Sequence, residues 1–176
     1  MFDPTAFENL KIVIEGAVYD KDLSGEILVI DRNEVINMAK LERSFDITFI
    51  EQNSGGKEIK ALWILEAKIE NLAAELLESA LSDTLAGSHV TVKFECEHAD
   101  DSTIYNKINN VLGEIWGAGR TIEQRIEMNP FHNKENIINH ITVNFNRLVH
   151  EDQIADLTLM VDFMIKSIRE LKKIFK

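Results

Sequence analysis

Cysteine, histidine and carboxylate side chains crowd into one short stretch, residues 95–101, of this 176-residue chain. On a strand, Cys96 and His98 would project to the same side, and both residue types bind zinc. A complete site would need ligands from elsewhere, such as His132 or His140, and the spacing matches no zinc-finger or HExxH arrangement. We interpret Cys96 as a small core residue and its acidic neighbours as a solvated strand face and a helix start, and we predict no metal site.

The five histidines and the many carboxylates could supply general acid–base chemistry. No Ser-His-Asp order, nucleophile elbow or paired-carboxylate motif can be recognised among them. Gly113, Gly117 and Gly119, with Arg120, resemble a glycine-rich loop. However, phosphate-binding loops run from a strand into a helix, and here the predicted order is helix to strand. We expect these glycines to end a helix, and we predict neither catalytic residues nor a cofactor site.

Four large aromatic residues could line a ligand pocket between a sheet and its helices: Tyr19, Trp63, Tyr105 and Trp116. Such residues are more often part of the core, and no cofactor fingerprint accompanies them. A small-molecule binding protein or enzyme with such a pocket is therefore the alternative function.

The longest amphipathic pattern lies at the C-terminal end, over residues 151–176. Its apolar residues are spaced three and four apart, which places them on one stripe of a helix. Met160 and Ile165 widen this stripe beyond a coiled-coil seam, as fits a helix lying on a sheet. Leu159 and Phe163 fall on the other side, among polar neighbours, so we predict that they bind a partner. The competing interpretation is that another part of the same chain covers them.

The rest of the chain divides into segments of period two and segments of helical spacing. Alternation predicts strands at 10–19, 26–30, 45–49, 58–67, 90–96, 122–128 and 141–145. Helical spacing predicts helices at 31–41, 67–85 and 101–116, followed by the long C-terminal helix. For residues 57–67 a helix is the alternative to a strand, because Ala, Leu, Glu and Lys are good helix formers.

Strands joined by short turns favour an antiparallel sheet, and helices with one wide apolar face favour packing on one side of it. The sequence therefore predicts a two-layer α+β fold in one domain, 1–176. Residues 1–86 and 87–176 could be two similar β-α-β-β-α halves. An offset of 77 residues, which lays Arg43 over Arg120, suggests an internal duplication.

The composition excludes some classes of partner. A net charge of −11, from 30 acidic and 19 basic residues, argues against binding to nucleic acid, which requires clustered Lys and Arg. No apolar run approaches the roughly 18 residues that span a membrane, and the start of the chain does not resemble a signal peptide. The single cysteine cannot form an internal disulfide. These features predict a cytoplasmic protein, and the abundance of Ile, Lys, Asn and Glu resembles proteins from AT-rich bacterial genomes.

Together, the wide C-terminal helix and the lack of a chemical motif predict a non-enzymatic protein that acts by protein–protein association, as a homodimer. Leu159 and Phe163 are the predicted contact residues.

Overall fold

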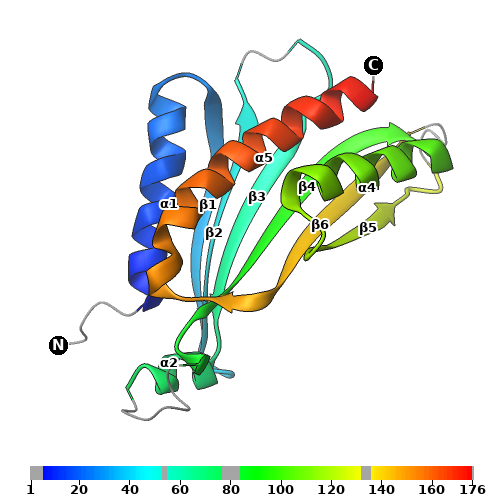
Figure 1. Ribbon diagram of the computed structural model, residues 1–176. Coiled ribbons are helices and arrows are strands. Elements are labelled where there is room, and N and C mark those ends of the chain that lie inside the picture. The colour runs from blue at the N-terminus through cyan, green and yellow to red at the C-terminus, as the bar shows by residue number, and fades with distance from the viewer. Residues whose placement is uncertain (1–5, 53–54, 77–83, 132–135, 176) are drawn as a thin grey trace.

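The structure is a computed structural model that describes residues 6–52, 55–76, 84–131 and 136–175. The elements follow one another in the order α1 (Ala6–Leu23), β1 (Ile27–Asn37), β2 (Glu42–Glu51), β3 (Lys60–Ala67), α2 (Ile69–Ala74), β4 (Ser88–Ala99), α4 (Ser102–Trp116), β5 (Thr121–Glu127), β6 (Asn136–Val149), the short 3₁₀ helix η1 (Glu151–Gln153) and α5 (Ile154–Ile174) (Figure 1). In the described part of the chain, no helix is both long and apolar enough to cross a bilayer.

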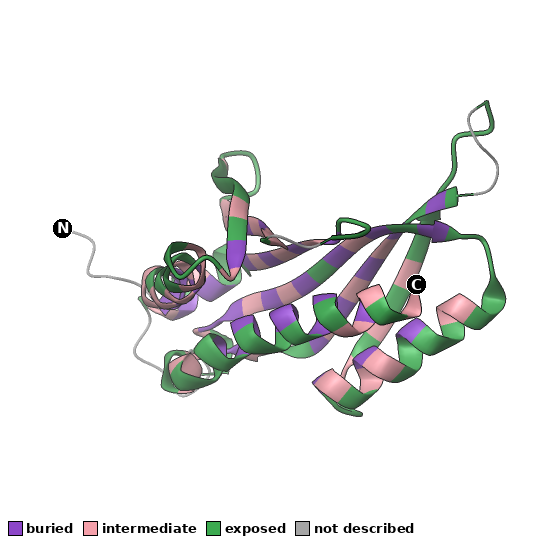
Figure 2. Ribbon diagram, turned by 90° about the horizontal axis from the view of Figure 1, so that it is seen from above, coloured by how far each residue is buried: buried purple, intermediate pink, exposed green. Residues whose placement is uncertain are grey.

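The strands form one antiparallel sheet of six, in the order β1-β2-β3-β4-β6-β5. Helices α1, α5 and α4 lie over one face of this sheet, with α5 between the other two (Figure 1). Viewed from above, α5 and α4 lie on the same side of the sheet, and burial alternates along the strands (Figure 2). The predicted two-layer α+β fold with a long C-terminal helix is confirmed.

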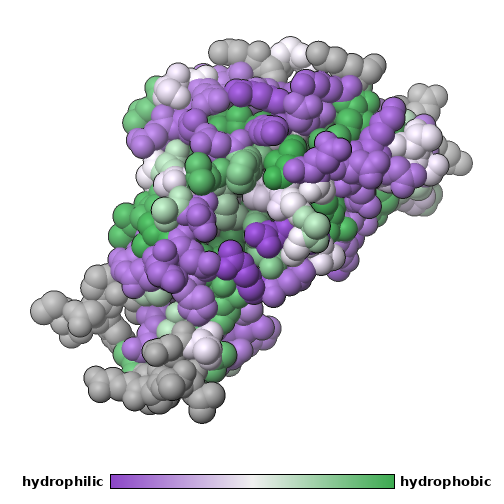
Figure 3. Space-filling view, in the orientation of Figure 1, coloured by the Kyte–Doolittle hydropathy of each residue, from purple (hydrophilic) through white to green (hydrophobic). Residues whose placement is uncertain are grey.

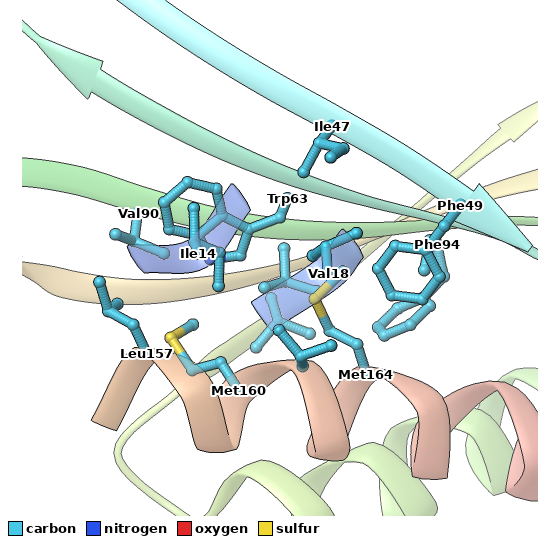
Figure 4. Close-up of a cluster of buried hydrophobic side chains, with 14 of the residues drawn as sticks. Ile14, Val18, Ile47, Phe49, Trp63, Val90, Phe94, Leu157, Met160 and Met164 are labelled. Atoms are coloured by element: carbon cyan, nitrogen blue, oxygen red, sulfur yellow. The ribbon is translucent and has the colours of Figure 1, made fainter. Parts of the chain in front are cut away.

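The core lies between the sheet and the helices. Period-two alternation along β2 turns Phe45, Ile47 and Phe49 toward the helices, and all three are fully buried. From the opposite side, Leu157 and Met164 of α5 point at the sheet (Figure 4). The apolar stripe predicted for the C-terminal helix therefore packs against the sheet as expected.

Residues 10–19 correct the first predicted strand, because they form part of α1. Leu10, Ile14 and Val18 follow one another at intervals of four residues and are all fully buried, whereas Ile12 is 59% exposed. A strand would have turned Ile12 and Ile14 to the same face, so the helical period describes this segment.

Residues 31–41 correct the first predicted helix, because most of them belong to the edge strand β1. This strand pairs with β2 from Ile27 to Asn37, with a bulge between Val29 and Asp31. Glu34, expected to complete a helix N-cap, instead binds Lys11 of α1 and Arg43 of β2. Tertiary pairing has overridden the local capping pattern.

Most of the remaining elements lie where they were predicted, although β6 (Asn136–Val149) extends well beyond the predicted strand at 141–145. Residues 60–67 form the strand β3, which decides between strand and helix for this segment. Helix α2 follows at Ile69. The rest of the helix predicted at 67–85 falls partly on residues 77–83, outside the described residues. Asp101 caps α4 by accepting a hydrogen bond from the backbone N–H of Thr103.

Residues 87–176 have the predicted β-α-β-β-α order, but residues 1–86 have the order α-β-β-β-α. The internal duplication stays a prediction.

Candidate interaction site

Leu159 and Phe163 lie outside the buried stripe of α5, with 53% and 42% of their surface exposed. Both border a hollow of about 170 Å³ between α5, the end of α4 and the end of β6. We refer to this hollow as the α5 groove. It is lined by Trp116, Arg120, Phe145, Arg147, Val149, Gln153, Asp156, Leu157, Leu159, Met160 and Phe163.

Aromatic rings in fixed positions form the apolar part of the groove. The Trp116 ring meets Phe145 edge-on at 5.6 Å between centroids and Phe163 at 5.8 Å. Its indole N–H donates to Ser167 Oγ at 3.0 Å, and the Ser167 hydroxyl donates in turn to the carbonyl of Phe163 at 2.7 Å. The first hydrogen bond ties the end of α4 to α5, and the second, within α5, orients the Ser167 hydroxyl, so the aromatic surface is preorganised.

Local backbone features place the other wall. Helix α4 ends at Trp116 because Gly117 takes a φ of 86°, which confirms the predicted role of this glycine. In β6, Asn146 also takes a positive φ, of 55°, and its side chain donates to Thr121 Oγ1 at 2.8 Å. Strand alternation is interrupted there, since Phe145 is buried while both Asn146 and Arg147 are exposed.

The basic wall of the groove holds the arginines that lack an acidic partner. Of the six arginines in the chain, four bind glutamates: Arg32, Arg43, Arg125 and Arg169. Arg120 and Arg147 make no ion pair with any residue that the structure describes. The Arg120 guanidinium lies 4.8 Å over the Phe145 ring, and its buried Nε has no hydrogen-bond partner. In a chain of net charge −11, two unpaired cations at one groove mark a surface suited to an acidic group.

The opposite wall, on α5, carries one carboxylate, that of Asp156, among apolar side chains. Asp156 is exposed in the first turn of α5 and has no ion-pair partner within the described ranges. A carboxylate here also stabilises the helix through its dipole. The α5 groove therefore has an aromatic floor, a cationic wall and an anionic wall.

Two larger hollows elsewhere contain charges that are mostly neutralised within the chain. In a hollow of about 420 Å³ at the C-terminal end of α5, Arg169 and Lys172 bind Glu51 at 2.7 and 2.6 Å. In a hollow of about 270 Å³ on the open face of the sheet, Lys60 binds Glu95 at 2.8 Å. These internal pairs leave less charge for a partner than the α5 groove does.

The predicted chemistry-bearing cluster at 95–101 is divided between the two faces of the sheet. Cys96 and His98 point toward the core, as their spacing predicts, and are 2% and 1% exposed, while His140 lies on the open face and contacts Glu127 at 3.0 Å. His132 lies outside the described residues. Burial raises the pKa of the Cys96 thiol to about 12, so the thiolate is absent at neutral pH. The part of the chain that is described contains no group of three potential metal ligands.

His98 lies in a buried hydrogen-bond network that the sequence did not reveal. Its Nδ1 lies 2.8 Å from the carbonyl of Ala99, and its Nε2 lies 2.9 Å from the side-chain nitrogen of Asn139. The carbonyl requires a proton on Nδ1, and the Asn139 amide then donates to an unprotonated Nε2. Burial lowers the pKa of His98, which agrees with a neutral, structural imidazole.

Of the four aromatic residues proposed to line a pocket, Trp116 lies at the α5 groove. Trp63 is fully buried among core side chains (Figure 4). The Tyr105 hydroxyl donates to Asp100 at 2.7 Å, and Tyr19 is a partly exposed residue of α1. Sequence reasoning missed Arg147 and Asp156 as groove residues because neither lies in a recognisable motif.

In the space-filling view of the helix-bearing face, hydrophobic side chains lie in hollows flanked by hydrophilic ones (Figure 3).

Comparison of the chain with protein-family models, with curated proteins and with solved structures gave no match.

Proposed function

We propose that the protein is a non-enzymatic, cytoplasmic bacterial protein that acts by protein–protein association, as a homodimer, through the α5 groove. The observation that carries this proposal is the exposure of Leu159 and Phe163 beside two unpaired arginines. Apolar side chains next to unpaired guanidinium groups gain most when a partner covers them.

The size of the hollow supports a protein partner over a small molecule. Pockets for drug-sized ligands have volumes of roughly 300–1,000 Å³. The α5 groove holds about 170 Å³, which is room for protruding side chains of another chain.

A small carboxylate is the alternative occupant. Arg120 and Arg147 could bind its charge while Trp116 covers its apolar part. Isothermal titration of aromatic and aliphatic carboxylates against the wild type and an Arg147→Glu variant tests this alternative. Binding to the wild type that the variant loses would support the alternative; an absence of binding heat would remove it.

The edge strand β1 is a competing surface for association. Six exposed apolar residues lie on or just after it: Leu28, Ile30, Val35, Ile36, Met38 and Leu41. However, its bulge between Val29 and Asp31 interrupts the free edge, and Arg32 is bound to Glu15 of α1. Bulges and charges of this kind protect edge strands from pairing. The β1 edge therefore serves as the control surface.

Light scattering coupled to size-exclusion chromatography tests the proposal. We expect a dimeric wild type, a monomeric Leu159→Glu/Phe163→Glu variant and a dimeric Val35→Glu/Ile36→Glu control. Circular dichroism shows whether each variant is folded. A monomeric wild type would refute the homodimer, and a groove variant that still dimerises would refute the groove as its interface.

A further inference from the structure

We infer that the two copies meet groove to groove about a twofold axis parallel to the α5 groove, so that Arg120 and Arg147 of each copy face Asp156 of the other. This inference rests on the proposed homodimer and specifies its geometry. It follows from the distribution of unpaired charge across the groove.

A twofold-symmetric interface uses the same patch on both subunits, so the patch must complement itself. The α5 groove has Arg120 and Arg147 on one wall and Asp156 on the other, and none of the three has an ion-pair partner among the residues described. A surface that carries both signs of unpaired charge, separated by an apolar floor, meets this requirement.

The separation of the charges also selects the direction of the axis. If the twofold axis ran across the groove, each basic wall would face the basic wall of the second copy, and like charges would oppose association. If the axis runs along the groove, each basic wall faces the α5 wall of the second copy. Opposite charges then meet on both sides of the groove.

The same geometry covers the apolar residues. With the axis along the groove, α5 of the second copy faces the wall formed by the ends of α4 and β6, which brings its Leu159 and Phe163 toward Trp116. An aromatic floor that is already fixed by Ser167 receives them without reorganisation. The exposed pair and the unpaired charges are thus covered by one contact.

Charge reversal in two separate chains tests this arrangement. An Arg147→Glu chain places glutamate against Asp156 in both symmetric contacts, and an Asp156→Lys chain places lysine against the arginines. Each variant alone is expected to dimerise at least about tenfold more weakly than the wild type, because like charges replace opposite ones. Arg147 and Asp156 are both exposed and have no ion pair in the described structure, so we expect both variants to fold. Lysine at position 156 loses the favourable interaction of Asp156 with the dipole of α5, so circular dichroism should confirm that this variant is folded.

Mixing the two variants restores an opposite-charge pair in each of the two contacts. In the mixed dimer, the glutamate introduced into one chain faces the lysine introduced into the other, and the unchanged Arg147 and Asp156 face each other across the second contact. Native mass spectrometry of an equimolar mixture should show a heterodimer that forms more strongly than either homodimer, but more weakly than the wild-type dimer, because Arg120 still faces the introduced lysine. As a matched control, Arg125→Glu changes the same residue type on β5, outside the groove, and should leave dimerisation unchanged.

The possible results separate this inference from the proposed function. If the Leu159→Glu/Phe163→Glu variant is monomeric but the charge variants dimerise like the wild type, the groove is the interface and the charge pairing is wrong. If both charge variants are weakened and their mixture forms no more dimer than either variant alone, the axis is wrong. A monomeric wild type overturns both.

Discussion

Two isoleucines in α1 provide a quantitative test of one of the two elements that the sequence pattern predicted wrongly. Ile14 is fully buried against the core, and Ile12, two residues earlier, is 59% exposed. Replacing each with alanine removes the same three carbon atoms from different environments. We therefore compare Ile14→Ala with Ile12→Ala as matched variants.

The expected losses differ several-fold. Removing three buried carbons from Ile14 costs about 2.4 kcal/mol at about 0.8 kcal/mol per carbon. The cavity left behind raises the range to about 2–5 kcal/mol. The better helix propensity of alanine returns less than about 0.7 kcal/mol. For the exposed Ile12 the change should stay within about 0.5 kcal/mol.

Urea unfolding followed by circular dichroism measures both variants. All samples should be at one protein concentration, because the stability of a dimer depends on it. We expect the midpoint of Ile14→Ala to fall clearly and that of Ile12→Ala to stay near the wild type, with unchanged slopes. Similar losses for both variants would place the two residues on one face, as in a strand, and would refute the assignment of α1.

Three further predictions concern local features of the fold. The free energy of unfolding should fall as the pH falls below about 6.5, because His98 then binds a proton in the unfolded chain but, with its lowered pKa, not in the folded one. Urea unfolding at pH 7.5 and 5.5 should show a smaller loss of stability for His98→Gln than for the wild type. An equal loss in the two proteins would contradict this role of His98. Gly117→Ala should lower the free energy of unfolding by about 1–3 kcal/mol, because alanine is strained at a φ of 86°. Gly119→Ala should be nearly neutral, because its added Cβ meets nothing within 4 Å. Equal thermal unfolding midpoints for the two variants would argue against strain at Gly117. Cys96, 2% exposed and with its pKa raised to about 12, should react with a thiol reagent only after unfolding, and rapid reaction of the native protein would contradict its burial.

The sequence predicted those elements whose periodicity fitted one structure only. The strand β4 and the helices α4 and α5 were found close to their expected positions. In α1, Leu10, Ile14 and Val18 satisfy both a period of two and a spacing of four, so alternation alone could not separate strand from helix. In β1, the Asp31 and Glu34 spacing imitated a helix cap, and pairing with β2 decided the structure.

The candidate site was predictable only in part. Helical geometry alone places Leu159 and Phe163 away from the apolar stripe of α5, and their exposure agrees with that prediction. The approach of Arg120 and Arg147 to α5 depends on how α4 crosses α5 and on the irregular backbone at Asn146. Neither the crossing nor the irregular backbone has a signal in local sequence periodicity.

The molar mass of the wild-type chain over a concentration series tests the proposed association most directly. The homodimer predicts a mass that approaches twice the 20.1 kDa of one chain, and a Leu159→Glu/Phe163→Glu variant that remains at one chain. A wild type that remains at 20.1 kDa throughout the series would contradict it.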